Sequence, residues 1–454
     1  MDRIMIAGAT SGCGKTTVSI GIMAAMASVG KKVAPFKVGP DYIDPQFHGF
    51  VTGRESTNLD SFLLDENSVM QMLFEGSQGS DISVIEGVMG LYDGLGVKSC
   101  IGSSAHVSKI AKCPVVLVLD GKGVSASIAA QVMGYAGFDP GVDVRGVIIN
   151  RVSGERHYSI LKEAIECHTG VKCLGYLPKT EEVALGSRHL GLIPAGEVKE
   201  LSEKIDRLSQ LVKSHIDIEG LIKIANGACT LDQPSDPAKD LLDYAKGLRL
   251  GVAMDKGFNF YYGANIRLFR KMGFEIEYFS PISDKSLPND IDGLYIGGGF
   301  PEVFAKEIEK NSEMRSRMRK SLESGMFAYA ECGGLMYLTE KVTGLDGSES
   351  EMVGFFPAKA AMTRRLQRFG YVEFECEGIT GRTRAHEFHR SYVELKEDIV
   401  TAYNVFKKRE SGEGDSWSCG FCKKNVMAGY AHVHFYSNMD FARMIADRIM
   451  GSRI

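Results

Sequence analysis

The sequence has no apolar run long enough to form a membrane-spanning helix. Such a helix needs about 18 or more consecutive apolar residues, and no stretch of the 454 residues reaches that length. The first residues, MDRIMIAGATSG, also lack the charged and then apolar pattern and the cleavage site of a secretory signal. They predict a first buried strand instead. We therefore expect a cytoplasmic protein without a membrane partner.

A surplus of basic residues is missing as well. The chain has 53 Lys and Arg against 57 Asp and Glu, a formal net charge of −4. Proteins whose main partner is nucleic acid usually carry a broad basic surface, so no nucleic-acid partner is expected. The hydrophobic content of 44% and the charged content of 24% are typical of a globular enzyme.

The ten cysteines lack the regular spacing of a disulfide or zinc framework, which favours reduced thiols. One close pair, Cys419 and Cys422 in CGFC, could form half a zinc site or a redox pair. No second CxxC and no suitably spaced histidine pair accompanies it, so plain thiols remain the favoured interpretation.

Apolar segments alternate with helix-like stretches, which predicts an α/β fold with a parallel sheet. The strand candidates of the first half are RIMIAGA, KVAPFKVG, DISVIEG, CPVVLVLD and VRGVIIN. A second series begins near Leu248 with LRLGVAMD, FEIEYFSP, GLYIGGG and MFAYAECGG. The stretch between them is rich in small, polar and proline residues. We therefore expect domains at 1–228 and 247–454, joined by a linker at 229–246.

The segment ATSGCGKTT matches a phosphate-binding loop in which Ala9 replaces the first glycine. It follows a predicted strand and opens a predicted helix, as the motif requires. Backbone N–H groups and the helix N-terminus would hold anionic oxygens. Lys15 would neutralise the β and γ phosphates of ATP, and the Thr16 hydroxyl would bind Mg²⁺. The nucleotide-binding residues expected here are Gly12, Gly14, Lys15, Thr16 and Thr17.

Carboxylates follow two further strands at the same predicted sheet edge. Asp41 and Asp44 lie in VGPDYIDP after the strand that ends near Lys37, and Glu86 ends the strand DISVIEG. Carboxylates grouped beside a phosphate loop could share one or two magnesium ions. Asn150, at the end of VRGVIIN, could bind an adenine edge or could simply terminate its strand.

The second half contains a candidate nucleophile, Cys332 in AYAECGGLMYL. A sharp turn from strand to helix would expose its sulfur, and a helix N-terminus lowers the pKa of a thiol. The backbone N–H groups of Gly298, in YIGGGFPE, and of Gly333 could form an oxyanion hole.

A nucleophilic cysteine also needs a base. His432 and His434 in GYAHVHFYSN are two residues apart, and we expect only one of them to meet Cys332. RAHEFHRS offers two further histidines, His386 and His389.

In this order, the motifs resemble the cobyrinic acid a,c-diamide synthase family over nearly the whole chain. The pieces that carry the resemblance are ATSGCGKTT, FKVGPDYIDP, EGVMGLYDG, SRHLGLIPA, YIGGGFPE, AYAECGG, HEFH and HVHF. The first half is also similar to dethiobiotin synthetase, and the second half to class I glutamine amidotransferases. The resemblance implies a P-loop NTPase-like parallel-sheet domain followed by a class I glutamine amidotransferase-like α/β domain.

The resemblance also implies a reaction. Glutamine would be hydrolysed in the second domain, and the ammonia would pass to the first. There ATP and Mg²⁺ would activate the a and c carboxylates of cobyrinate, or of a related tetrapyrrole, as acyl phosphates that ammonia converts to amides. This is a carbon–nitrogen ligase step of cobalamin biosynthesis, and a homodimer is compatible with it.

Family roles can be assigned to particular residues. Cys332 would be the nucleophile, and His434 its base, because its place before Phe435 matches the amidotransferase histidine. The glutamate of the usual His-x-Glu arrangement is missing, since Tyr436 occupies that position. The implied catalytic carboxylates are Asp41, Asp44 and Glu86, and the implied magnesium ligands are Thr16, Asp41 and Glu86. Lys37 and Asn150 would add contacts to the nucleotide. Tyr42 and Arg188 would contact the substrate, and further cations for its carboxylates are Arg364, Arg365 and Arg368.

Three alternatives stay open at this point. The sibling enzyme that amidates nickel-sirohydrochlorin needs the same site chemistry. A ParA- or MinD-like partitioning ATPase has a similar phosphate loop, although it needs no second domain with a reactive cysteine. A regulatory protein with an inactive amidotransferase half would bind ligands without hydrolysing glutamine.

Overall fold

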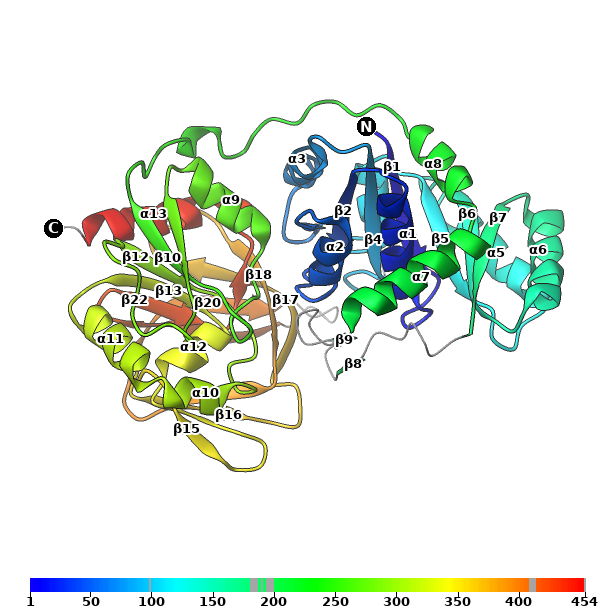
Figure 1. The fold of residues 1–454 in the computed structure, drawn as a ribbon. Coiled ribbons are helices and arrows are strands. Elements are labelled where there is room, and N and C mark those ends of the chain that lie inside the picture. Colours follow the sequence, from blue (N-terminus) through cyan, green and yellow to red (C-terminus); the bar gives the residue numbers. More distant parts are fainter. Residues whose placement is uncertain (98, 180–186, 189–190, 193–199, 408–413, 453–454) are drawn as a thin grey trace. The chain divides into compact units, whose positions relative to one another are not determined.

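The computed structural model describes residues 1–97, 99–179, 187–188, 191–192, 200–407 and 414–452. The chain divides into two compact units, Met1–Asp236 and Pro237–Ile454. Figure 1 shows the helices and strands of both.

The first unit is built on a seven-stranded sheet in the order β3-β2-β4-β1-β5-β6-β7, and every pair of neighbours in it is parallel. The prediction of a parallel α/β sheet is therefore confirmed. Its strands are β1 Arg3–Gly8, β2 Val33–Val38, β3 Thr57–Leu59, β4 Ile82–Gly90, β5 Val115–Asp120, β6 Val144–Val152 and β7 Lys172–Pro178. Its helices are α1 Lys15–Ser28, α2 Asp44–Thr52, α3 Glu66–Ser77, α4 Ser104–Ile110, α5 Ser127–Phe138, α6 Glu155–Thr169, α7 Leu201–His215 and α8 Ile218–Asn226, and β8 Ser187–Arg188 pairs with β9 Gly191–Leu192.

The parallel arrangement sets the position of the first site. The carboxyl ends of β1, β2 and β4 meet at one edge of the sheet, since β4 pairs with both of the others. In this register Glu86 lies opposite Lys37 on one side and Ile6 on the other. The phosphate loop, which follows β1, therefore lies beside the acidic residues.

The second unit carries a ten-stranded mixed sheet in the order β11-β10-β12-β13-β22-β21-β20-β17-β18-β23 and a four-stranded sheet in the order β15-β14-β16-β19. The strands are β10 Arg249–Ala253, β11 Glu275–Phe279, β12 Gly293–Ile296, β13 Phe327–Glu331, β14 Lys341–Thr343, β15 Glu349–Glu351, β16 Ala358–Met362, β17 Arg368–Cys376, β18 Thr383–His389, β19 Ser391–Leu395, β20 Val400–Lys407, β21 Asp415–Lys423, β22 Val426–Gly429 and β23 His432–Val433. The helices are η2 Lys239–Leu241, α9 Gly263–Lys271, α10 Ala305–Lys310, α11 Ser312–Glu323, α12 Gly333–Leu338, η3 Phe435–Ser437 and α13 Met439–Gly451. β10–β13 and β22 pair in parallel, and β13 leads directly to α12.

Most residues of the stretch predicted as a linker, 229–246, are exposed, but both of its ends make contacts. At its start the Cys229 carbonyl accepts a hydrogen bond of 2.5 Å from Arg3, and Ser235 bonds to Asn67. At its end Leu241 and Ala245 are buried in the second unit. The division between the units falls between Asp236 and Pro237.

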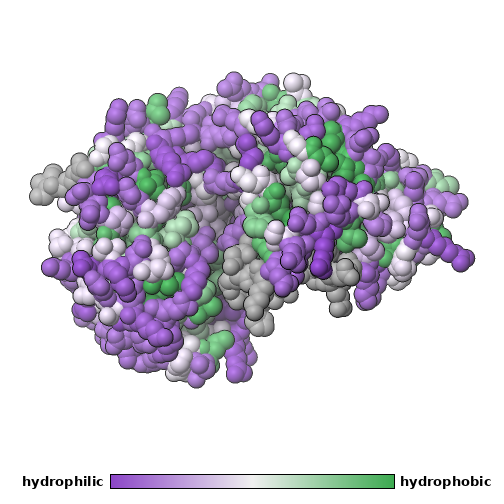
Figure 2. All heavy atoms as spheres, in the orientation of Figure 1, coloured by the Kyte–Doolittle hydropathy of each residue, from purple (hydrophilic) through white to green (hydrophobic). Residues whose placement is uncertain are grey.

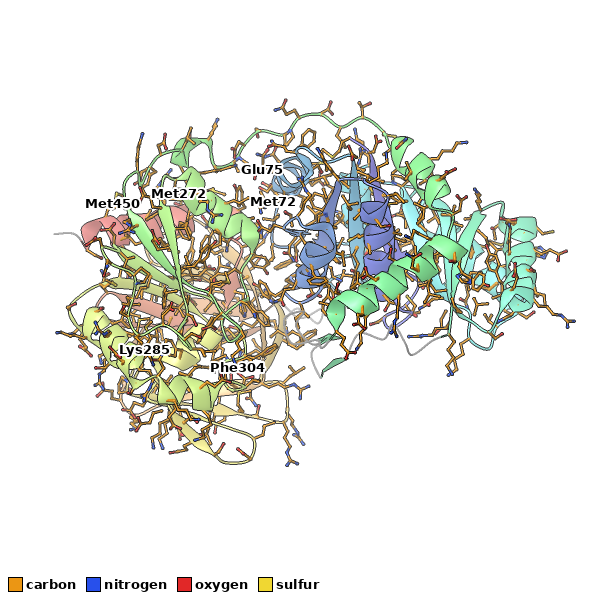
Figure 3. The ribbon with its side chains drawn as sticks, viewed as in Figure 1. Met72, Glu75, Met272, Lys285, Phe304 and Met450 are labelled. Atoms are coloured by element: carbon orange, nitrogen blue, oxygen red, sulfur yellow. The ribbon has the colours of Figure 1, made fainter. Side chains whose placement is uncertain are left out.

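Each unit has its own apolar core. Met72, after the first turn of α3, and Met272, which follows α9, are fully buried and are labelled in Figure 3. Hydrophilic residues cover most of the face drawn in Figure 2. In the part of the chain that the structure describes, no helix is both long and apolar enough to cross a membrane.

Candidate active sites

The phosphate loop between β1 and α1 adopts a conformation that demands glycine. Gly12 and Gly14 have φ angles of 79° and 89°, a region that other residues rarely adopt. A Cβ atom on Gly14 would lie 2.0 Å from the Asn150 side-chain nitrogen. That nitrogen donates a hydrogen bond of 2.9 Å to the Cys13 carbonyl. Asn150 thus fastens the loop with one of the two N–H groups of its amide nitrogen, and its contact with an adenine edge stays a prediction.

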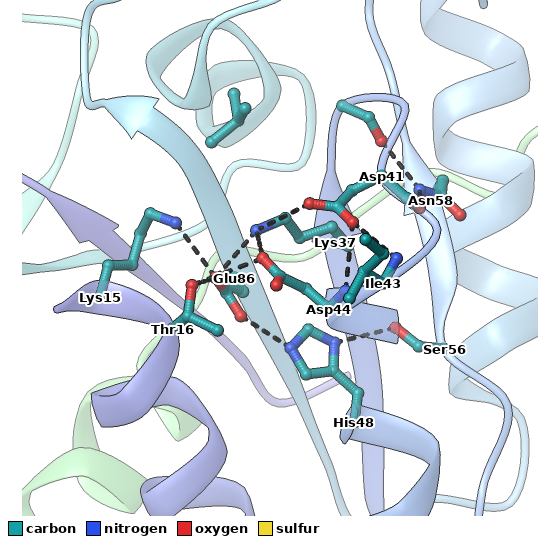
Figure 4. Close-up of polar contacts among 12 residues, drawn as sticks. Lys15, Thr16, Lys37, Asp41, Ile43, Asp44, His48, Ser56, Asn58 and Glu86 are labelled. Atoms are coloured by element: carbon teal, nitrogen blue, oxygen red, sulfur yellow. Dashed lines mark hydrogen bonds and ion pairs between the residues drawn. The ribbon is translucent and has the colours of Figure 1, made fainter. Parts of the chain in front are cut away.

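Glu86 is the centre of a buried polar network beside this loop (Figure 4). Its Oε1 atom accepts hydrogen bonds from Thr16 Oγ1 at 2.6 Å, Lys37 Nζ at 2.8 Å and Lys15 Nζ at 3.1 Å. Its Oε2 atom lies 2.7 Å from His48 Nε2. The carboxylate thereby links the phosphate loop, β2 and α2.

Asp44 joins the same network from the first residue of α2. Its Oδ2 atom accepts from Lys37 Nζ at 2.5 Å and from Thr16 Oγ1 at 3.4 Å. The side chain of Asp41 is about one-third exposed and lies farther away, with Oδ2 3.9 Å from Lys37 Nζ. Asp41 Oδ1 instead accepts the backbone N–H groups of Ile43 and Asp44. Asp44 therefore contacts Thr16 and lies closer to Lys37 than Asp41 does.

The charges of this network shift its pKa values in opposite directions. Burial would raise the pKa of Glu86, but Lys37, Lys15 and His48 outweigh it and hold that pKa well below its usual range. Burial and the nearby charge of Asp41 raise the pKa of Asp44 to about 7 against the effect of Lys37. Burial opposes a charge on Lys37, yet Asp44, Glu86 and Asp41 raise its pKa. The site therefore holds Lys37 charged and Glu86 ionised, while Asp44 titrates near neutrality.

Two further residues that the sequence predicts to contact substrate belong to the first unit. Tyr42 is 9% exposed and lies in the loop between Asp41 and Asp44. Arg188 ends β8, but its side chain and most of the segment SRHLGLIPA lie outside the described residues.

In the second unit, Cys332 occupies the sharp turn between β13 and α12. Its φ angle of 48° and ψ angle of −101° are unusual for a residue with a side chain. Strain of this kind often marks a functional position. The turn is tight enough to require glycine at position 334, because a Cβ atom added to Gly334 would lie 2.2 Å from the Ile296 carbonyl oxygen. Cys332 is 8% exposed.

The imidazole that meets Cys332 belongs to His432. Burial would lower the pKa of His432, but the charge of Cys332, a hydrogen bond to Cys332 and the nearby carboxylate of Glu331 raise it to about 10. Glu331 Oε2 lies 3.8 Å from His432 Nδ1. A thiol, an imidazole and a carboxylate therefore meet at the end of β13.

The expectation that His434 faces the thiol is corrected by this geometry. The predicted strand is short: β23 ends at Val433, and His434 precedes the 3₁₀ turn η3. The His434 ring packs on Tyr262 with centroids 4.8 Å apart, and neither nitrogen has a hydrogen-bond partner among the described residues. Burial and the charge of Arg267 lower its pKa to about 3. His434 is thus a neutral ring in the core.

The histidines of HEFH have other partners. His386 stacks on His432 with centroids 5.0 Å apart, and its Nδ1 lies 3.0 Å from the Tyr262 hydroxyl. His389 stacks on Tyr430, and its Nδ1 lies 2.7 Å from the Ser391 carbonyl. His386 therefore supports the base from one side.

The glycines of YIGGGFPE pack against this centre. A Cβ atom on Gly298 would lie 2.4 Å from Cε1 of His432. A Cβ atom on Gly333 would lie 3.1 Å from the backbone nitrogen of Gly299. The Gly297 N–H already donates to the Tyr261 hydroxyl at 2.7 Å. The close approach of this loop to His432 and to the start of α12 requires glycine.

Sequence reasoning missed two residues of these sites, His48 and Glu331. His48 is fully buried, and its Nδ1 lies 3.1 Å from Ser56 Oγ. Its signal was the spacing of four residues from Asp44, which places both on one face of a helix. The signal of Glu331 was an acid directly before the nucleophile.

Family models describe both units. Residues 4–193 match the CobQ/CobB/MinD/ParA nucleotide binding domain, and residues 249–439 match the CobB/CobQ-like glutamine amidotransferase domain. The chain therefore combines a nucleotide-binding domain with a glutamine amidotransferase domain.

Full-length relatives narrow this class to one family. "Cobyrinate a,c-diamide synthase" of Clostridium acetobutylicum is 46% identical over 98% of this chain and 99% of its own length. The proteins of the same name from Listeria innocua and Thermoplasma volcanium are 46% and 44% identical, over 96% and 97% of this chain and 97% and 95% of their own lengths. The chain belongs to the cobyrinate a,c-diamide synthase family. Because these matches span both units, the partitioning-ATPase alternative is set aside.

Proposed function

We propose that this protein amidates the a and c carboxylates of cobyrinate, with glutamine as the nitrogen donor and ATP as the activating nucleotide. The observation that carries the proposal is the presence of two complementary sites in one chain. One is a phosphate loop beside a Lys37–Asp44–Glu86 network, and the other is a thiol–imidazole pair in an amidotransferase domain. The names of the full-length relatives support cobyrinate as the substrate.

In the second unit, the proposed nucleophile is Cys332 and the proposed base is His432. The imidazole takes the thiol proton, and the thiolate attacks the side-chain amide of glutamine. His432 then returns the proton to the leaving nitrogen, which departs as ammonia and leaves a thioester on Cys332. Water hydrolyses the thioester, releasing glutamate and restoring the thiol. Backbone N–H groups of Gly298 and Gly333 would stabilise the oxyanion.

In the first unit, the carboxylate of the substrate attacks the γ-phosphate of ATP and becomes an acyl phosphate, with ADP as the leaving group. Ammonia then displaces phosphate and forms the amide. Lys15 and Lys37 carry positive charge beside the phosphate loop, where negative charge spreads during phosphoryl transfer. His48 and Lys37 hold the Glu86 carboxylate in position.

The oxygens of this network are of the type that magnesium prefers, although Lys37 and Lys15 contact the same carboxylates in this structure. Mg²⁺ prefers hard oxygen ligands, and the Thr16 hydroxyl, Glu86 and Asp44 converge with separations of 2.6 and 3.4 Å from Thr16 Oγ1. We propose Thr16, Glu86 and Asp44 as the protein ligands, with Asp44 in place of the more exposed Asp41. When bound, the ion would screen the charge of the nucleotide phosphates. Asp41 and Tyr42 are left for the substrate.

The test is mass spectrometry of the products formed from cobyrinate and, separately, from nickel-sirohydrochlorin, with ATP, Mg²⁺ and glutamine. Each amidation replaces a hydroxyl by an amino group, so two successive mass decrements are expected with cobyrinate. Decrements with nickel-sirohydrochlorin alone would assign the protein to the sibling reaction. If neither tetrapyrrole gained an amide, the proposed function would be wrong.

A further inference from the structure

We propose that Glu331 is the residue that positions the catalytic imidazole, and that it replaces the glutamate that amidotransferases place two residues after the histidine. This inference rests on the proposed roles of Cys332 and His432. The position two residues after His434 holds Tyr436, and the one two residues after His432 holds the His434 ring, which packs on Tyr262. Neither supplies a carboxylate.

Glu331 lies where such a carboxylate is needed. It is the last residue of β13, directly before the nucleophile, and only 1% of it is exposed. Its Oε2 atom is 3.8 Å from His432 Nδ1. Catalytic hydrogen bonds are often long in a free enzyme and tighten when substrate binds. A carboxylate on Nδ1 leaves Nε2 as the nitrogen that exchanges a proton with the thiol.

Three neutral donors hold the Glu331 side chain in place. Oε1 accepts from the Tyr329 hydroxyl at 2.9 Å and from the Val433 backbone N–H at 3.1 Å, and Oε2 accepts from the Tyr295 hydroxyl at 3.2 Å. Residues of β12, β13 and β23 therefore fix one carboxylate. A side chain bonded in this way can orient an imidazole because it cannot itself swing away.

The need to compensate the charge of the buried Glu331 carboxylate supports the same pairing with His432. A buried carboxylate is stable only when its charge is compensated. Within the described ranges, no Lys or Arg forms an ion pair with Glu331, and His432 is the cationic partner that the structure places beside it. Glu331 would therefore stabilise the imidazolium that forms when His432 accepts the thiol proton.

The decisive variant is Glu331→Gln in the full-length protein, assayed as glutamate release from glutamine. We expect glutaminase kcat to fall by about 10²-fold or more, the range of a displaced acid–base group. We also expect the high-pH limb of the kcat profile to move to lower pH, because an amide does not stabilise the imidazolium. A purely structural role would lower activity without moving that limb.

Ammonia-dependent amidation provides an internal control, because it bypasses the thiol and should be unchanged in Glu331→Gln. Retained glutaminase kcat with an unmoved limb would overturn the proposal.

If Glu331→Gln fails to fold, Tyr295→Phe replaces it, since it removes a donor from the carboxylate oxygen that faces His432. Its matched control is Tyr337→Phe, which removes a buried hydroxyl on α12 that has no hydrogen-bond partner among the described residues. A limb that moves in Tyr295→Phe alone supports the role of Glu331, and equal profiles in both variants contradict it.

These readouts do not involve a tetrapyrrole. Failure of the proposed function would appear as the absence of amide products from both macrocycles, whereas failure of the Glu331 proposal would appear only in the glutaminase profile.

Discussion

His432 and His434 differ in their surroundings although one residue separates them. The first shares a buried centre with Cys332 and Glu331, and the second is a neutral ring on Tyr262. We predict that His432→Ala lowers glutaminase kcat by about 10² to 10⁴-fold, the usual contribution of a general base. His434→Phe should retain most of the activity and should not lower the thermal unfolding midpoint, because an apolar ring removes two buried nitrogens without partners. The reverse order of activity loss in the two variants would restore His434 as the base.

Asp44 makes the stability of the free protein depend on pH. Its pKa is raised from 3.8 to about 7, chiefly by burial, so the folded state keeps a proton that the unfolded state has released across this range. The stabilisation from this proton is complete below the unfolded pKa and is lost as pH rises to about 7. We predict that the midpoint of the wild type falls relative to that of Asp44→Asn as pH rises through this window, without nucleotide. Above it, the difference should stay constant. A wild-type midpoint that instead rises relative to that of Asp44→Asn as pH increases would show that the ion pair between Lys37 and ionised Asp44 dominates.

At the scale of strands and helices, the sequence predicts those buried strands that appear as a short apolar run ending in a polar residue. The strands carrying Lys37 and Glu86 were predictable in this way, and their parallel pairing alone brings the two residues into register. His48 was not predictable as a site residue, because its contact with Glu86 depends on how α2 crosses the sheet. The preference for His434 rested on its place before Phe435 in the family pattern, which does not show what each ring contacts. Those contacts depend on where β23 ends and η3 begins.

The approach of the 297–299 loop to His432 gives a prediction at this scale. Gly298→Ala would place a methyl group 2.4 Å from Cε1 of His432, so the imidazole or the loop must shift and the pairing of His432 with Cys332 is disturbed. We expect glutaminase activity to fall by at least about 10²-fold, as for loss of the base itself, while ammonia-dependent amidation persists. The matched control is Gly451→Ala at the end of α13, where a Cβ atom meets nothing within 4 Å. Equal activity in the two variants would mean that the loop yields without disturbing the imidazole.

For the whole molecule, the central property is that each unit carries its own core and its own site, while the proposed reaction needs both. Each half-reaction should therefore be separable by a single substitution. Cys332→Ala removes the sulfur on which the thioester forms, and Lys15→Ala removes an ammonium group that contacts Glu86 beside the phosphate loop. Neither side chain belongs to the core of the other unit, so each variant should fold.

We predict that Cys332→Ala abolishes glutamate release and glutamine-dependent amidation but retains amidation with ammonium salts at the wild-type rate. Lys15→Ala should retain glutamate release and lose amidation with either nitrogen source by about 10² to 10³-fold, the effect of removing one electrostatic contact to a transition state. Glutamate release and amide formation, measured separately in both variants with both nitrogen sources, distinguish these outcomes. If Cys332→Ala also lost ammonia-dependent amidation, the thiol would serve the ligase site directly, and the assignment of the two reactions to separate units would be wrong. If Lys15→Ala instead lost glutamate release, nucleotide binding would control the glutaminase, and the two sites would be coupled before any ammonia is formed.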